Sequence, residues 1–433
     1  MIDLGGLELA LSQARMQKAR GRLLTAVGPL LEAELPGAVV GGLCRVGENC
    51  TCEVVGFKDR RALLMPLGTT EGVSYGADVT WQDESITVQV GDELLGRVLD
   101  GLGRPIDGGP PLTARARRSV AAHAPSALER SLITEPIATG VKVLDGLLTL
   151  GRGQRISIMA GSGVGKSTLL GMIARNVEAD VNVVCLIGER GREVREFIEL
   201  NLGPEGLARS VLVVVTSEQS PALQVKGAFL AQTIAEHFRD TGRDVLVLMD
   251  SITRLAQAQR QIGLAAGEPP TRGGFTPSVF SVLPALLERA GPAGGGGSIT
   301  GIYTVLVEGD DIHDPIGDAV RGIVDGHVVL SRKLAMHGQY PAVDVLASLS
   351  RLMSRVAGPP HREGANRFRD LLATWRENEE LIRLGAYRKG TSKDVDEAVA
   401  RVDALKDFVC QGTEDAMEFS ATVKALRMAV GLG

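Results

Sequence analysis

Aromatic residues are scarce in this 433-residue chain, where phenylalanine, tryptophan and tyrosine together make up 3%. Basic residues are not in excess either, because 47 lysines and arginines face 52 aspartates and glutamates. A net charge of −5 argues against a broad nucleic-acid-binding surface. No apolar run approaches the ~20 residues of a membrane span. The first residues lack the basic segment of a signal peptide, so we expect none.

Cysteine is also rare, and its spacing suggests neither disulfides nor a metal site. The five cysteines stand at positions 44, 50, 52, 185 and 410. Cys50 and Cys52 lie too close together for a zinc-binding pair, and no second pair follows. Reduced thiols in the cytosol are the favoured interpretation.

Glycine, in contrast, is abundant. The chain has 54 glycines, which is nearly twice the usual share of ~7%. Many glycines suit a chain with many turns between strands and helices. The length is sufficient for two or three domains with a sizeable core.

The clearest chemical signal lies at residues 155–170. The apolar run 155–160 predicts a strand, a glycine-rich turn follows, and Lys166 opens a predicted helix. Glycines let backbone N–H groups surround phosphate oxygens, and the helix N-terminus favours an anion. We expect Lys166 to contact the β- and γ-phosphates and Ser167 to bind Mg²⁺. Ala160 stands where the strict motif has glycine. The predicted nucleotide-binding residues of this loop are Gly161, Ser162, Gly163, Val164, Gly165, Lys166, Ser167 and Thr168.

Apolar strands alternate with helical patterns from about residue 132 to 333, which predicts an α/β fold with a parallel sheet. The runs 211–215 and 245–249 are continuously apolar, as expected for strands covered on both faces. The predicted strands are 155–160, 183–187, 211–216, 245–249, 299–307 and 327–331. The predicted helices are 167–178, 191–200, 221–241, 251–263 and 278–290.

The regions on either side differ in character. Residues 1–20 are predicted to form an amphipathic helix that either packs on the next domain or docks to a partner. Residues 21–90 contain short apolar runs separated by turn residues, which predicts a small β-barrel or sandwich. We assign 91–360 to the nucleotide-binding domain, with a linker at 108–131.

Residues 361–433 are predicted to be helical. Ser392 is a candidate N-cap for a helix whose apolar residues recur with the helical period. Gly412 is expected to end that helix.

Charged residues follow two predicted strands at the sheet edge that carries the phosphate loop. Asp250 closes one strand, where a carboxylate can hold Mg²⁺ through a water; a helix N-cap before Ser251 is the alternative. Glu189 and Arg190 close another strand. Glu189 can polarise the attacking water, and Arg190 can hold developing negative charge. On the residues alone, a solvated charge cluster is the alternative for this pair.

Two residues after the sheet are further candidates. Tyr340 precedes Pro341 outside the strands and is a candidate for stacking on adenine. Arg351 is a candidate arginine finger, although the pattern alone favours an ordinary surface arginine. The glycine-rich loops within 263–297 suit an element that moves with the nucleotide state, and equally a surface turn.

Several longer strings, together with the phosphate loop, resemble the type III protein export ATPases. These strings are residues 131–141, 151–155, 188–195, 277–280, 306–311, 325–331 and 385–387. The resemblance covers nearly the whole chain. It is closer to the flagellar branch (the flagellum-specific ATP synthases) than to the virulence injectisome branch, through residues 161–165, 169–175 and 267–270.

That family is related to the catalytic subunits of rotary ATPases. The resemblance implies a RecA-like P-loop ATPase domain with an N-terminal β-barrel and a C-terminal helical domain. It also implies a homohexameric ring with ATP and Mg²⁺ at the subunit boundaries. The implied roles are phosphate and Mg²⁺ binding for Lys166 and Ser167, catalytic glutamate for Glu189, γ-phosphate arginine for Arg190, Walker-B aspartate for Asp250, adenine stacking for Tyr340 and trans arginine finger for Arg351.

The resemblance implies partners as well. Residues 1–20 match the segment that docks a stator-like regulatory protein, and the region near 275–280 matches a pore-facing loop. Further implied partners are export gate and stalk proteins, export substrates and their chaperones, with no nucleic acid. The implied location is the cytoplasmic face of the inner membrane, reached only through partners.

We therefore predict an ATPase that energises export of unfolded flagellar proteins. The alternatives are an injectisome ATPase, a rotary ATP synthase catalytic subunit, a non-catalytic nucleotide-binding ring subunit and an RNA translocase of the transcription-terminator type. The strings at 306–331 and 385–387 argue against the synthase, and Glu189 argues against a non-catalytic subunit. Residues 21–90 hold five cations, too few for an RNA-binding domain.

Overall fold

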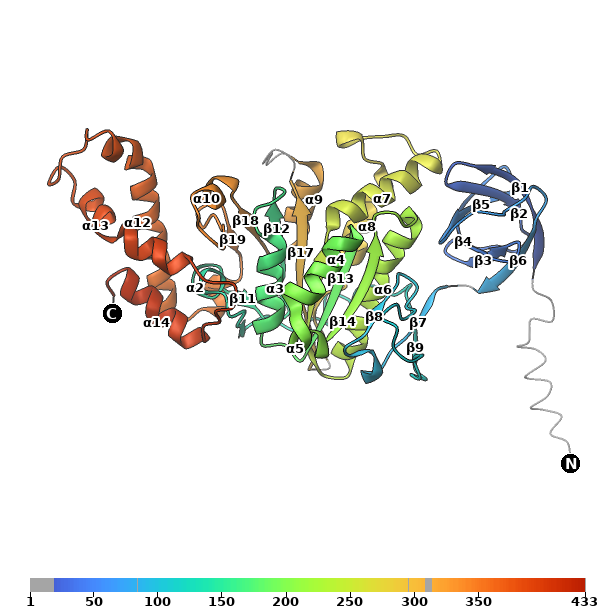
Figure 1. Ribbon diagram of the computed structural model, residues 1–433, viewed down its shortest axis with the longest axis horizontal. Coiled ribbons are helices and arrows are strands. Elements are labelled where there is room, and N and C mark those ends of the chain that lie inside the picture. The colour runs from blue at the N-terminus through green and yellow to red at the C-terminus, as the bar shows by residue number, and fades with distance from the viewer. Residues whose placement is uncertain (1–18, 84, 295, 308–313, 433) are drawn as a thin grey trace, which may run out of the picture.

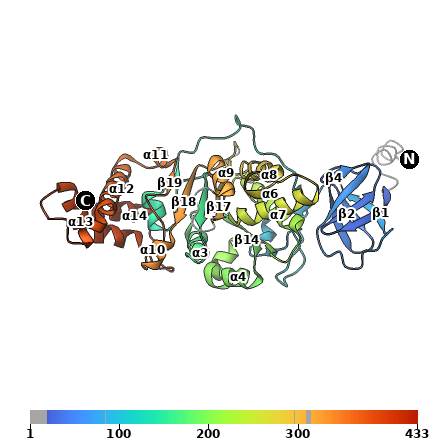
Figure 2. The same ribbon diagram turned by 90° about the horizontal axis from the view of Figure 1, so that it is seen from above.

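The computed structural model describes residues 19–83, 85–294, 296–307 and 314–432. Three parts follow one another along an elongated molecule (Figure 1). A barrel lies at one end, a sheet covered by helices lies in the middle, and the C-terminal helices lie at the other end. The view from above shows the same order (Figure 2). The helix predicted at 1–20 lies outside the described residues up to residue 18, and Arg20 already belongs to the first strand.

Six antiparallel strands close into the N-terminal barrel in the order β1-β2-β5-β4-β3-β6. They are β1 (Arg20–Val27), β2 (Leu30–Glu34), β3 (Leu43–Val46), β4 (Cys50–Lys58), β5 (Arg61–Pro66) and β6 (Asp78–Asp83). Inward-facing apolar side chains such as Leu23, Val54 and Trp81 fill the interior. The predicted barrel is confirmed, but it ends before residue 90. Strand β7 (Thr87–Gln89) leaves it and pairs with β9 (Arg117–Ser119) in the predicted linker.

A nine-stranded sheet forms the centre of the molecule, in the order β19-β18-β12-β17-β15-β13-β14-β8, with β16 paired to β17. The six predicted strands are β12 (Arg155–Ala160), β13 (Val181–Glu189), β14 (Ser210–Thr216), β15 (Asp244–Asp250), β17 (Ser298–Leu306) and β18 (Gly326–Leu330). These six pair in parallel, as predicted. Three two-residue strands at the margins were not predicted: β8 (Val98–Leu99), β16 (Gly291–Pro292) and β19 (Leu349–Ser350). Of these, β16 and β19 run antiparallel.

Helices cover both faces of this sheet, which explains why its strands are continuously apolar. One face packs against α6 (Pro221–Asp240), α7 (Ile252–Ala265), α8 (Pro277–Leu287) and α9 (Pro315–Ile323). The other packs against α2 (Lys142–Leu147), α3 (Lys166–Asn176) and the π-helix η2 (Phe197–Leu202). On β13, Val183 and Cys185 face the first layer, and Val184 and Leu186 face the second. The helix predicted at 191–200 is α4 (Gly191–Glu196), which continues directly into η2.

The C-terminal region is helical, as predicted. Its main helices are α12 (Pro359–Arg383), α13 (Lys393–Val409) and α14 (Phe419–Ala429), preceded by α10 (Arg332–Met336) and α11 (Met353–Val356). Ser392 occupies the N-cap position of α13, but within the described chain its side chain makes no capping hydrogen bond. Its carbonyl accepts hydrogen bonds from the Asp396 N–H and the Tyr387 hydroxyl. The helix ends at Val409, before Gly412, so the predicted stop was wrong by a few residues.

Candidate functional site

The segment 161–165 connects β12 to α3 as a tight loop. Gly163 and Gly165 have φ angles of 77° and 89°, a left-handed region that glycine adopts without strain. Gly165 is the N-cap of α3, so Lys166 begins the helix. Val164 is buried and anchors the loop, whereas Ser162, Gly163 and Ser167 are exposed. The loop therefore presents the free N–H groups of a helix N-terminus to solvent, an arrangement suited to a phosphate.

Three charged side chains meet beside this loop. Lys166 Nζ lies 2.5 Å from Asp250 Oδ1 and 3.6 Å from Glu189 Oε1. The Thr304 hydroxyl on β17 donates to Asp250 Oδ1 at 2.7 Å. Asp250, Glu189 and Lys166 reach the same place because β15, β13 and β12 are parallel and end at one edge of the sheet. We refer to Lys166, Glu189, Asp250 and Thr304 as the charged cluster.

The alternative role for Asp250, as a helix cap, is not seen. The N-cap of α7 is Ser251, whose hydroxyl accepts the Arg254 N–H at 3.3 Å. Asp250 instead ends β15 and is 4% exposed. Its carboxylate is therefore bound by Lys166 and Thr304 and does not cap the helix that follows.

The environment of Glu189 changes its titration. Burial, a hydrogen bond with Glu193 and the negative charge of Asp250 together raise the pKa of Glu189 to about 7, against the attraction of Lys166. The pKa of Glu193 is lowered, first by the hydrogen bond from Glu189. A carboxyl group that titrates near neutral pH can both give and take a proton there, which suits a general base.

The structure does not bring the two candidate arginines into the charged cluster. Arg190 caps α4, its side chain is 76% exposed, and its Nη1 lies 3.3 Å from Glu193 Oε1. Arg351 follows the edge strand β19 and is exposed; its Nη2 donates to the Arg321 carbonyl at 3.3 Å. Within one chain, then, Arg190 lies at the exposed rim of the charged cluster, and Arg351 lies at the edge of the sheet formed by β19.

Tyr340 lies next to the phosphate loop. A Cβ built at Gly165 would come 3.6 Å from Cδ1 of its ring, and Tyr340 is 47% exposed. Its ring borders a cavity of about 730 Å³, a volume typical of ligand sites. Lys142, Gly338 and residues 410–412 and 414–417 of the loop after α13 form the rest of the wall. Sequence reasoning missed this loop, because it lies some 70 residues along the chain from Tyr340 and carries no local motif.

Comparison with known proteins places the chain in a family. Residues 140–350 match the ATP synthase alpha/beta family, nucleotide-binding domain, and residues 357–428 match the T3SS EscN ATPase C-terminal domain. The flagellum-specific ATP synthase of Bacillus subtilis is 48% identical over 96% of both chains. The type 3 secretion system ATPase of Xanthomonas euvesicatoria is 50% identical over 97% of this chain and 96% of its own.

The chain belongs to the family of flagellar and type III secretion ATPases. The assembled ATPase EscN from the enteropathogenic E. coli type III secretion system aligns with a TM-score of 0.91 at 45% identity, over 95% of this chain and 100% of its own. Membership makes the chain an ATPase with a nucleotide-binding domain of the ATP synthase alpha/beta family. Its match to the EscN C-terminal domain argues against a rotary ATP synthase subunit.

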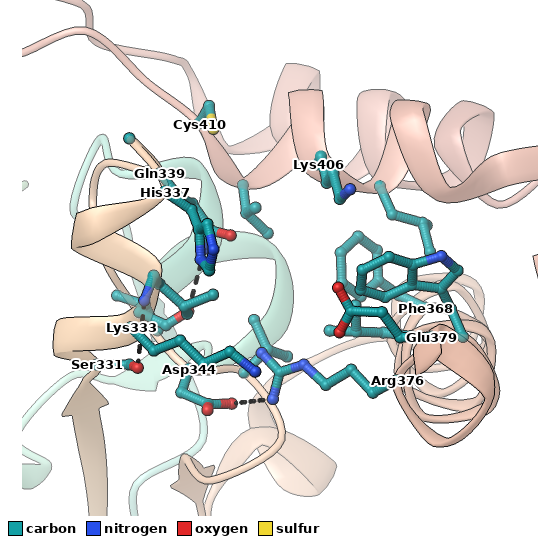
Figure 3. A pocket seen from close by; sticks show the side chains of 18 residues that line it. Ser331, Lys333, His337, Gln339, Asp344, Phe368, Arg376, Glu379, Lys406 and Cys410 are labelled. Carbon is teal, nitrogen blue, oxygen red and sulfur yellow. Dashed lines mark hydrogen bonds and ion pairs between the residues drawn. The ribbon is translucent and has the colours of Figure 1, made fainter. Parts of the chain in front are cut away.

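A second cavity, of about 620 Å³, lies between the ATPase domain of this export ATPase and the helices α12 and α13 (Figure 3). Lys406 Nζ lies 4.5 Å from the ring centroid of Trp375 on one wall. Arg376 reaches across it to Asp344 at 2.8 Å. In the described residues, no three histidines, cysteines or carboxylates cluster as a metal site, and no helix has the length and apolar character needed to cross a membrane.

Proposed function

We propose that this ATPase hydrolyses Mg·ATP to energise export of unfolded proteins through a type III apparatus of the flagellar kind. One observation carries the proposal: Lys166, Asp250 and Glu189 converge beside a phosphate loop in a chain about as similar to flagellar as to secretion ATPases. Because both kinds of relative are 48–50% identical, the flagellar branch rests on the shorter strings noted above and stays a prediction.

The site is suited to a magnesium nucleotide. Mg²⁺ prefers hard oxygen ligands, keeps several waters, and takes only one or two ligands from the protein beside the phosphates. The exposed Ser167 hydroxyl and the Asp250 carboxylate are such ligands, the second through a water. Lys166 would move from Asp250 to the β- and γ-phosphates. Held by these two residues, Mg²⁺ would supply positive charge that neutralises the negative charge developing on the phosphates.

Glu189 is the proposed general base. Its carboxylate accepts a proton from the attacking water, the water oxygen bonds to the γ-phosphorus, and the bond from that phosphorus to the β,γ-bridging oxygen breaks to leave ADP. Tyr340 would stack on the adenine in the 730 Å³ cavity. The loop residues Gly161, Ser162, Gly163, Val164, Gly165 and Thr168 would line the phosphates with their backbone.

A homohexameric ring would complete the site. Arg351 of a neighbouring subunit would stabilise the transition-state charge, and Arg190 would assist from the rim after turning away from Glu193. The solved complex of EscN with its central stalk EscO, with a TM-score of 0.88 at 45% identity, supports a stalk partner for this chain too. The other proposed partners are a stator-like protein at residues 1–20, the export gate, and substrates with their chaperones. The proposed location is the cytoplasmic face of the inner membrane.

Two experiments test the proposal. Purified protein with Mg²⁺ should release phosphate from ATP, and Glu189→Gln should bind ATP and release almost none. If the wild type released no phosphate at any concentration, the proposal would be overturned. Expression in a strain that lacks its flagellar ATPase should restore motility. If it restored injectisome secretion instead, the flagellar branch would be wrong.

A further inference from the structure

Gln411 ties together three segments that surround the Tyr340 cavity. Its side-chain Oε1 accepts the Lys142 N–H at 2.7 Å, and its Nε2 donates to the carbonyls of Gly140 and Asp415, both at 2.8 Å. Its backbone N–H donates to the Tyr340 carbonyl at 2.9 Å. One residue therefore links the start of α2, the tyrosine and the loop that faces the tyrosine.

The position of Gln411 along the chain connects these bonds to the end of α13. α13 ends at Val409, Cys410 follows, and Gln411 is the next residue. In Figure 3, Cys410 and Gln339, the neighbours of Gln411 and Tyr340, lie at the same end of the 620 Å³ cavity between the domains. Because Gln411 follows the end of α13 and bonds directly to Tyr340, a displacement of α13 can reach the tyrosine through this bond.

The loop after Gln411 is also held by Arg175, which donates to the Thr413 carbonyl and lies 3.6 Å from Glu414 Oε1. Residues 412–416 are exposed, whereas Gln411 is partly buried. Both polar ends of the Gln411 amide are paired with backbone groups, which fixes the orientation of the amide as well as the path of the loop. Without the amide, the Lys142 N–H and the Gly140 carbonyl each lose a partner, and the loop loses the bond to its Asp415 carbonyl.

We infer that Gln411 is the positioning residue of the base subsite. It holds Tyr340 and the 411–415 loop at the spacing that admits a nucleotide base, and it couples that spacing to the position of α13. The inference rests on the proposed function, because it takes the Tyr340 cavity as the place of the base. Phosphate binding, by contrast, depends on Lys166 and the phosphate loop.

This division predicts different effects on ligands with and without a base. ATP and ADP use both parts of the site, whereas inorganic tripolyphosphate can use only the phosphate loop. Removing the Gln411 amide should therefore weaken the binding of ADP and leave the binding of tripolyphosphate unchanged. If Gln411 had only a structural role, its removal would weaken the binding of both ligands together or of neither.

The experiment compares inhibition constants in the full-length ATPase. In Gln411→Ala, we expect the KM for ATP and the inhibition constant of ADP to rise about tenfold or more. We expect kcat to stay within about twofold, and tripolyphosphate to inhibit as in the wild type. Gln411→Glu keeps the oxygen that accepts from Lys142 and loses both donated bonds. Its KM for ATP and its inhibition constant for ADP should therefore lie between those of the wild type and Gln411→Ala. This isosteric variant also serves as the test if Gln411→Ala does not fold.

Two matched controls separate positioning from general loosening. Thr413→Ala changes an exposed side chain on the same loop, outside the cavity lining. Arg376→Ala breaks the other tie across the domain cavity, to Asp344. Both should leave the ratio of the ADP and tripolyphosphate constants unchanged. An unchanged ratio in both Gln411 variants, or an equal change in Arg376→Ala, would overturn the inference. If the wild type hydrolysed no ATP and Lys166→Ala changed nothing, the proposed function would fail instead.

Discussion

Lys166 Nζ lies 2.5 Å from Asp250 Oδ1, although the two strands that lead to these residues are not neighbours. β17 runs between β12 and β15, so the lysine side chain crosses the end of that strand to reach the aspartate. Thr304, on the intervening strand, donates to the same oxygen. The proposed phosphate-binding lysine and the proposed metal-binding carboxylate thus lie beside each other, and their charges neutralise one another.

The first prediction concerns the subunit boundary. Arg351→Ala should lower kcat by about 10³–10⁵-fold, because loss of a finger arginine has effects of that size in related chemistry. ATP binding should persist, since Lys166 and the phosphate loop are intact. The measurement is phosphate release, with nucleotide binding assayed in parallel.

Mixing two inactive variants sharpens that test. Lys166→Ala lacks the proposed phosphate-binding lysine and Arg351→Ala lacks the proposed arginine finger, but a mixed ring would contain boundaries with both groups intact. Activity should therefore reappear when the two proteins are mixed. Complete inactivity of the mixture, with rings shown to exchange subunits, would count against a shared site.

The second prediction is a pH dependence set by Glu189. Its pKa is raised to about 7, so the carboxylate needed as a base is lost as the pH falls below that value. We expect kcat/KM to fall about tenfold per pH unit well below pH 7 and to level off above it. In Glu193→Gln the midpoint should move to lower pH, because the neighbouring carboxyl group helps to raise the pKa. A flat profile between pH 5.5 and 8 would contradict this role.

The third prediction concerns the left-handed residue of the phosphate loop. Gly165→Ala forces a side chain into φ 89°, which costs about 1–2 kcal/mol. The added methyl group would meet Tyr340 only at ordinary contact distance, so the cost comes from the backbone. The affinity for ADP should drop about tenfold, measured by calorimetry. Gly191→Ala, at a position with open space and an ordinary φ, is the control and should bind normally.

The fourth prediction is about stability. Arg289 is fully buried and makes two 2.7 Å bonds to Glu236, with a further bond to the Thr233 hydroxyl. Arg289→Leu leaves the Glu236 carboxylate buried without a counter-ion and should lower the free energy of unfolding by about 3–5 kcal/mol. Replacing Glu236 by leucine as well should recover much of that loss. Urea unfolding of the single and double variants measures both changes in the free energy of unfolding. A loss below about 1 kcal/mol in Arg289→Leu would contradict the prediction.

Much of the architecture was predictable because its signals are local. The predicted strand 155–160 is β12 residue for residue, since a short apolar run bounded by glycine has few other ways to fold. Lys166, Glu189 and Asp250 could be assigned to one edge because each follows a strand and the strands are parallel. Short pairings such as β7 with β9 were not predictable, because two or three residues leave no periodicity.

The parallel sheet, the phosphate loop and the family could all be predicted from the sequence, because each depends on runs of contiguous residues. Tertiary structure alone decided which distant segments meet around Tyr340. Gln411 and Gly140 are 271 positions apart and bond at 2.8 Å. A contact of that span depends on how two whole domains pack, and no stretch of either domain carries its pattern.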